Sequence, residues 1–122
     1  MDAAELQAEL RAILVPYEDT LEAAEIYGME VLRRRGAKAH DWFAGVQQVS
    51  DTVKFNFLPM HGHPELLAGL SPALLEHRTG ASVFKFSALD DALIEELETL
   101  VGRGFDVYML EASATKRPAK KR

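Results

Sequence analysis

Two histidines and a glutamate stand close together near the middle of the chain, in the stretch HGHPE at residues 61–65. Imidazole nitrogens and carboxylate oxygens are typical zinc ligands, and a catalytic zinc ion takes three protein ligands and keeps one position open. His61, His63 and Glu65 are therefore a candidate Zn²⁺ site. The alternative is an exposed loop that holds two histidines without a metal. Gly62 between them favours this alternative, because glycine leaves the loop conformation less restricted.

A second candidate metal site consists of glutamates in a segment, residues 17–27, that we expect to be helical. Glu18, Glu22 and Glu25 follow i, i+4, i+7 spacing, which places them on one face of a helix. Carboxylates gathered in this way bind hard cations weakly, and Fe²⁺ is the ion of interest here. The alternative is a solvated helix face.

A basic cluster, Arg33, Arg34, Arg35 and Lys38, lies near a predicted hairpin tip. It suits an anion or a nucleic-acid backbone, but the alternative is charge that protects a sheet edge from aggregation. Aromatic residues do not interleave with these charges, so the pattern does not indicate a base-stacking surface.

Aromatic side chains are concentrated in and around the predicted sheet, where they form either a core or the lining of a small-molecule pocket. Most of them alternate with polar residues, as expected for a half-buried strand. If a pocket exists, Tyr27 and Glu30 are the polar groups expected at its border. The predicted pocket therefore comprises Tyr27, Glu30, Trp42, Phe55 and Phe57.

Motifs of common enzyme classes are missing from the sequence. It contains no Gly-x-Ser-x-Gly elbow, no phosphate-binding glycine loop and no His-Glu-x-x-His motif. The chain has no cysteine, which excludes disulfides, thiolate metal sites and cysteine nucleophiles. These observations favour a binding protein over an enzyme without deciding the question.

Charge is unevenly distributed along the 122 residues, whose net charge is −5. Five basic residues lie in the last seven positions; without them, 9 basic and 19 acidic residues remain. We expect one folded domain over residues 1–111 and a disordered basic tail over residues 112–122. An acidic body argues against general nucleic-acid binding, which depends on neutralising phosphates.

Neither a secretory signal nor a membrane span is predicted. The first residues, MDAAE, are acidic and lack the basic and apolar regions of a signal peptide. Apolar runs stay far below the roughly 18 residues that a membrane span requires. We therefore expect a cytoplasmic protein.

The apolar pattern predicts an α+β fold in which helices pack on an antiparallel β-sheet of about five strands. Helices are expected at residues 2–15 and 17–27, short helical turns after Pro64 and Pro72, and a longer helix that the sequence SALD (residues 87–90) opens and Gly102 and Gly104 end. Strands are expected at residues 29–34, on both sides of a turn at Ser50-Asp51, at 83–86 and at 105–109.

Residues 25–31, EIYGMEV, resemble the signature E-x-K-W-G-M-P-x-[FY] of the DUF1801, or YdhG-like, family. The similarity continues through residues 43–57, 66–70 and 83–90, so it spans roughly residues 6–101. Tyr27 replaces the family's tryptophan and Glu30 its proline. The resemblance implies an antiparallel sheet with helices packed on it, and some family members are described as frataxin-like iron chaperones.

The sequence therefore predicts a non-enzymatic YdhG-like domain that binds a small molecule or a protein. The alternative is an intracellular iron chaperone that binds Fe²⁺ through acidic helix residues. Either a monomer or a homodimer is compatible with the sequence, because an exposed sheet edge permits pairing without specifying it.

Overall fold

A computed structural model describes residues 2–26, 29–37 and 41–116 of the chain. Within them, six strands form one antiparallel sheet in the order β1-β2-β3-β4-β6-β5. The strands are β1 (Glu22–Ile26), β2 (Met29–Arg33), β3 (Ala44–Val49), β4 (Thr52–Phe57), β5 (Arg78–Gly80) and β6 (Val83–Phe86). The helices are α1 (Ala3–Leu14), α2 (Pro59–Gly62), α3 (Pro72–Leu75) and α4 (Asp91–Lys116), with 3₁₀ turns η1 (Val15–Tyr17) and η2 (Pro64–Leu67). The predicted α+β class is confirmed.

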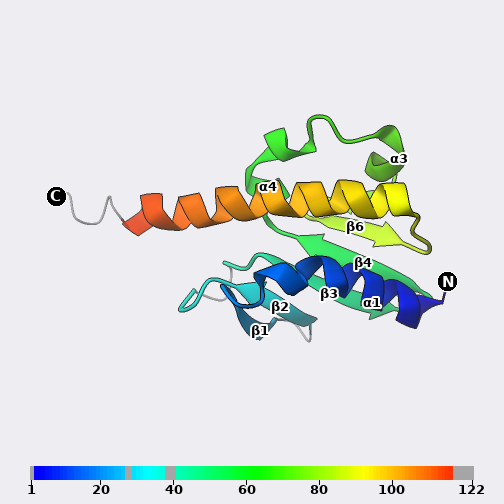
Figure 1. Cartoon of the computed structure of the whole chain (residues 1–122), viewed down its shortest axis with the longest axis horizontal. Coiled ribbons are helices and arrows are strands. Elements are labelled where there is room, and N and C mark those ends of the chain that lie inside the picture. Colours follow the sequence, from blue (N-terminus) through cyan, green and yellow to red (C-terminus); the bar gives the residue numbers. More distant parts are fainter. Residues whose placement is uncertain (1, 27–28, 38–40, 117–122) are drawn as a thin grey trace.

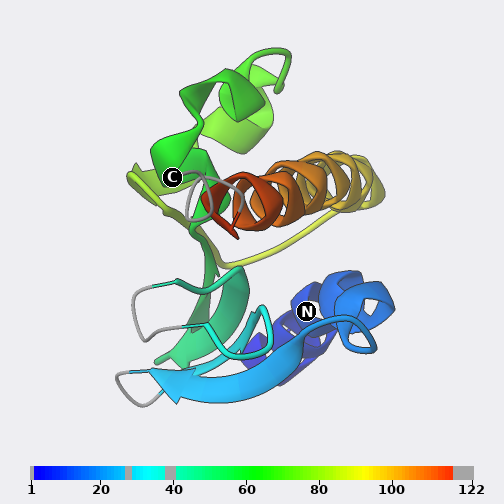
Figure 2. The ribbon, with the colours of Figure 1, turned by 90° about the vertical axis from the view of Figure 1, so that its left-hand side faces the viewer.

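The two long helices, α1 and α4, lie on the same side of the sheet (Figure 2). We call this the helix-facing side and the opposite one the open side. The short elements α2, η2 and α3 pack against α4 near β6, and the C-terminal part of α4 extends beyond the sheet (Figure 1). The larger core lies between the sheet and these helices.

Helix α1 begins and ends close to the predicted positions. Asp2 caps it, because its carboxylate accepts a hydrogen bond from the Glu5 N–H at 2.8 Å while the Glu5 carboxylate accepts one from the Asp2 N–H at 3.2 Å. Proline at position 16 falls in the 3₁₀ turn that follows. The apolar face of the helix is buried: Leu6, Leu10, Ile13 and Leu14.

The central hairpin is confirmed as β3 and β4. Ser50 and Asp51 form its turn, and Ser50 adopts a φ of 60°. The alternating residues of β4, Val53, Phe55 and Phe57, are fully buried. Trp42 does not share the face of Ala44 and Val46, because β3 begins only at Ala44 and strand alternation does not extend back to Trp42.

Residues 17–27 do not form the predicted second helix. Residues 22–26 are instead edge strand β1, which pairs with β2 from Glu22↔Arg33 to Ile26↔Met29. Alanine and glutamate favour helix by intrinsic propensity. Pairing with β2 overrides that preference and adds an ion pair between Glu22 and Arg33 at 3.1 Å.

Helix α4 is longer than predicted. Gly102 and Gly104 do not end it, and residues 105–109 are helical rather than a strand. The helical spacing of its buried positions continues through both glycines, from Leu97 to Tyr108. At Gly104 a Cβ would lie 2.2 Å from Cζ of Phe57, so glycine is required by packing.

Both ends of α4 also differ from expectation. Its first turn is capped by Asp90, whose carboxylate accepts a hydrogen bond from the Leu93 N–H at 2.8 Å. Ser87, predicted as the cap, lies before the helix. At the other end, residues 112–116 are helical where the sequence predicts disorder. The rest of the predicted tail, residues 117–122, lies outside the described residues.

Candidate functional site

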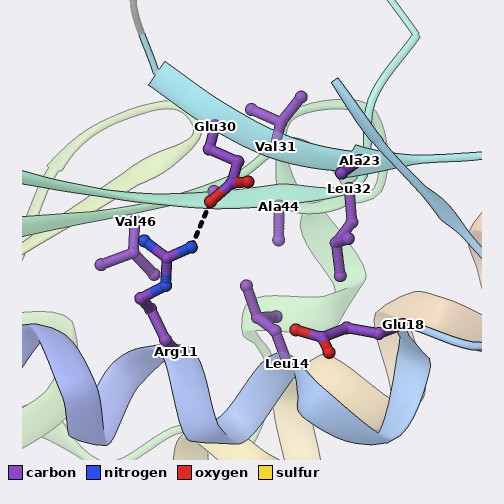
Figure 3. Close-up of a pocket in the computed structure, with 10 residues that line it drawn as sticks. Arg11, Leu14, Glu18, Ala23, Glu30, Val31, Leu32, Ala44 and Val46 are labelled. Carbon is purple, nitrogen blue, oxygen red and sulfur yellow. Dashed lines mark hydrogen bonds and ion pairs between the residues drawn. The ribbon is translucent and has the colours of Figure 1, made fainter. Parts of the chain in front are cut away.

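A pocket of about 300 Å³ lies between α1 and the β1–β3 part of the sheet (Figure 3). We call it the α1 pocket. Its walls combine apolar side chains with both signs of charge. The residues that line it are Arg11, Leu14, Glu18, Ala23, Glu30, Val31, Leu32, Ala44, Gly45 and Val46.

Small side chains on the helix-facing side of the sheet create the space. Ala23 pairs with Leu32, and Leu32 pairs with Ala44 on the next strand. Residues paired across antiparallel strands share one face, so these side chains form a continuous apolar floor. Leu14 of α1 approaches this floor from the opposite wall (Figure 3).

An ion pair crosses the pocket at one end. Arg11 of α1 donates a hydrogen bond to the carboxylate of Glu30 on β2 (Figure 3). Both side chains are about half exposed, at 51% and 56%, so solvent reaches this end. The pair bridges the helix to the sheet beside the apolar side chain of Val46 (Figure 3).

A carboxylate occupies the other end. Glu18 directly follows η1, and its side chain points into the space between α1 and the sheet, next to Leu14 (Figure 3). Among the described residues, the Glu18 carboxylate has no hydrogen bond or ion pair. A third acid, Glu25, is the cross-strand partner of Glu30 on β1. Negative charge therefore exceeds positive charge around the pocket.

The predicted pocket residues do not come together in the structure. Glu30 lines the α1 pocket, whereas Phe55 and Phe57 are fully buried in the main core. Trp42 packs with Ile26, Met29 and Val31 in a separate apolar cluster, outside the main core. Tyr27 lies outside the described residues.

The predicted acidic metal site loses its geometric basis. Glu22 and Glu25 lie on strand β1, where residues three apart point to opposite sides of the sheet. Glu22 pairs with Arg33, while Glu18 lies outside the strand in the α1 pocket. The iron-chaperone alternative stays a prediction, and Glu18, Glu22 and Glu25 do not lie on one common face as it assumed.

Of the two histidines, His61 lies in α2 and His63 lies between α2 and η2. His61 is exposed on α2, and Nδ1 of His63 lies 3.2 Å from the carboxylate of Glu65. Throughout the described ranges, no three histidine, aspartate or glutamate side chains are grouped so that they could hold a metal ion.

The arginines of the basic cluster interact within the domain. Arg33 pairs with Glu22, and Arg34 pairs with Asp41. Arg35 donates to the backbone carbonyl of Asp19, and Lys38 lies outside the described residues. Internal partners therefore account for much of the charge that the sequence offers to an anion.

Sequence reasoning missed most of the α1 pocket. Arg11 falls within the predicted first helix, but its partner Glu30 is distant in sequence. The available signal was size: Ala23 and Ala44 are small side chains at helix-facing positions, where the cross-strand partners are Leu32 for Ala23 and Phe57 for Ala44.

No protein-family model, curated protein or solved structure matches the chain. The resemblance to YdhG-like proteins therefore stays a prediction, and part of its signature, Tyr27 and Gly28, falls outside the described residues. No helix in the described part of the chain is both long and apolar enough to cross a membrane.

Proposed function

We propose that this protein is a non-enzymatic YdhG-like domain that binds a small molecule in the α1 pocket. One observation carries the proposal: an apolar floor lies between charged groups at both ends of one cavity. Small-molecule sites combine a mostly apolar lining with a few polar groups that fix orientation. The volume of about 300 Å³ is at the lower end of the usual range, which indicates a compact ligand.

Binding to a small molecule is favoured over binding to a protein because the site is concave. Protein interfaces bury about 800 Å² on each partner and need broad contact surfaces. The α1 pocket is instead a partly open concavity lined by residues of α1, of three strands and by Glu18. Its apolar floor lies between the Arg11–Glu30 pair at one end and Glu18 at the other (Figure 3).

Fragment screening by ¹H–¹⁵N NMR tests the proposal. A library of compact fragments, each an apolar ring with a cationic, anionic or neutral group, is titrated into the full chain. We expect saturable shifts in amides of α1, β1 and β2, and smaller ones in β6. Fragments are the appropriate probes because affinity per atom is highest for small ligands, up to about −1.5 kcal/mol per non-hydrogen atom.

A pocket-filling variant locates the binding. Ala23→Leu adds bulk at an exposed edge-strand position that lines the pocket, and it should abolish the shifts. Ala12→Leu makes the same change on an exposed position of α1 that does not line the pocket, and it should leave them intact. Equal binding by both variants, or no fragment that saturates, would contradict the proposal.

A further inference from the structure

We infer that the ligand of the α1 pocket is a small organic cation, a protonated amine on a compact apolar body. This inference rests on the proposed function and names its ligand class. It derives from the charge balance of the pocket and from the position of its unpaired carboxylate.

The charge balance favours a cation. The charged residues that line the pocket are Arg11, Glu18 and Glu30. Arg11 is matched by Glu30 in an ion pair, which leaves the carboxylate of Glu18, an exposed residue, without an ion-pair partner among the described residues. A bound ammonium group would bring the charge of the lining to zero.

The surroundings of Arg11 disfavour an anion. An anionic ligand would have to compete with Glu30 for the guanidinium and would separate an existing pair. The released Glu30 would then lose its cation while its cross-strand partner is Glu25, another acid. Like charges directly opposite on paired strands are destabilising.

The geometry matches an amine at one end of an apolar body. The Glu18 carboxylate lies beside Leu14, at one end of the floor that Ala23, Leu32 and Ala44 form (Figure 3). An ammonium group donates charge-assisted hydrogen bonds to such a carboxylate. The hydrocarbon body then lies along the floor toward the Arg11–Glu30 pair.

Three matched probes test the charge preference: 2-phenylethylammonium, neutral 2-phenylethanol and anionic 3-phenylpropanoate. Each is titrated into the full chain and followed by ¹H–¹⁵N NMR at low ionic strength. We expect the cation to bind about fivefold tighter than the alcohol, an advantage in the range of one exposed ion pair. The anion should bind more weakly than the alcohol. Added salt should reduce the advantage of the cation, because exposed charges are screened.

Two charge-matched variants assign the preference to one carboxylate. Glu18→Gln should remove the advantage of the cation and leave the affinity for 2-phenylethanol unchanged. Asp19→Asn changes the net charge equally at the adjacent exposed residue, which does not line the pocket, and it should keep the advantage.

The outcomes separate this inference from the proposed function. If the alcohol or the anion binds the pocket with the same affinity as the cation, the proposed small-molecule site is supported and the inferred preference for a cation is wrong. The same holds if Glu18→Gln and Asp19→Asn have equal effects. If none of the probes shifts residues of the pocket, the proposed function and this inference both fail.

Discussion

The helix-facing side of the sheet differs between its two halves. Over β4 and β6 it is filled by large side chains, and we call this part the closed half. Over β1, β2 and β3 it contains the α1 pocket, and we call this part the hollow half. In the closed half, Phe55 and Phe57 of β4 and Phe84 and Phe86 of β6 point toward the helices and are fully buried. In the hollow half, the corresponding positions include Ala23, Ala44 and Glu30, and the α1 pocket remains. The backbone hydrogen bonding is antiparallel throughout, so side-chain size creates the difference.

A single row of paired residues shows where the change occurs. Leu32 on β2 pairs with Ala44 on β3, and Ala44 pairs with Phe57 on β4. Phe57 reaches α4 so closely that Gly104 is needed opposite it. The side chain of Ala44 is too short to fill the space below α1 in the same way, and the α1 pocket lies there. The comparison teaches that a core and a binding site can share one sheet and differ by a few side chains.

The largest predicted effect compares matched leucines on α1. Leu10 is fully buried in the core and does not line the pocket, whereas Leu14 does. Leu10→Ala should lower the free energy of unfolding by about 2–5 kcal/mol, the usual cost of a new core cavity. Leu14→Ala should cost at least about 1 kcal/mol less, because its neighbourhood already includes empty space. Urea denaturation of both variants measures the difference, and equal losses would contradict a hollow half.

A glycine pair on α4 tests how tightly the closed half is packed. Gly104→Ala should destabilise the protein by about 1–3 kcal/mol, because the new methyl group overlaps the ring of Phe57. Gly102→Ala is the control: its Cβ would lie 3.4 Å from the Tyr17 hydroxyl, an ordinary contact. It should stabilise the helix by up to about 1 kcal/mol through higher helix propensity.

Opposite signs for the two alanine variants in thermal or urea denaturation would support this packing. If Gly104→Ala is stabilising like Gly102→Ala, then α4 does not approach β4 as described.

A smaller effect is expected where α4 is joined to the loop after β2. The Tyr108 hydroxyl accepts a hydrogen bond from the Arg34 N–H at 3.0 Å and donates one to the Asp41 carbonyl at 3.3 Å. The Arg34 guanidinium also lies 4.5 Å from the centre of the Tyr108 ring. Tyr108→Phe keeps the ring and removes the hydroxyl, and it should cost about 1 kcal/mol.

Hydrogen exchange of the Arg34 amide distinguishes this hydroxyl contact from general packing. We expect faster exchange at this amide in Tyr108→Phe, and unchanged exchange in β4. Unchanged protection of Arg34 would show that the hydroxyl does not hold the loop.

The smallest effect concerns pH. Burial, followed by the charges of Asp106 and Glu98, raises the pKa of Tyr17 above its ordinary value of 10.0. The folded state therefore favours the neutral phenol. The resulting contribution to the free energy of unfolding is complete below pH 10.0 and is lost as the pH rises through the pKa of the folded state. Stability should fall from pH 10.0 upward, and it should fall less steeply in Tyr17→Phe. Urea midpoints at several alkaline pH values measure both slopes, and parallel slopes would refute this assignment.

Local patterns predicted strand β4 better than strand β1. The alternation of Val53, Phe55 and Phe57 identified β4 and its buried face from neighbouring residues alone. In contrast, residues 22–26 have helical propensity, and only pairing with β2 makes them a strand. Gly28, between two short segments, was the available signal for a hairpin. The prediction that Gly104 ends the last helix was wrong for a similar reason, because the glycine is required by a contact with Phe57, which lies 47 positions earlier in the chain.

The candidate site could be predicted only in part. Glu30 was expected at the border of a pocket and lines one, but the aromatic residues expected beside it fill the core. The pocket exists because Ala23 and Ala44 have small side chains that leave space unfilled. An alanine in a strand does not alter the apolar periodicity, so the sequence pattern does not indicate a cavity. The Arg11–Glu30 pair likewise depends on how α1 lies across the sheet.

The most direct test of the account is a search for intermolecular NOEs between bound 2-phenylethylammonium and methyl groups of the protein, labelled with ¹³C at alanine and methionine. The account predicts NOEs from the ligand ring to the methyl groups of Ala23 and Ala44, which line the hollow half. NOEs to the methyl group of Met29 in the separate apolar cluster instead, or no NOE to Ala23 and Ala44 at saturation, would contradict it.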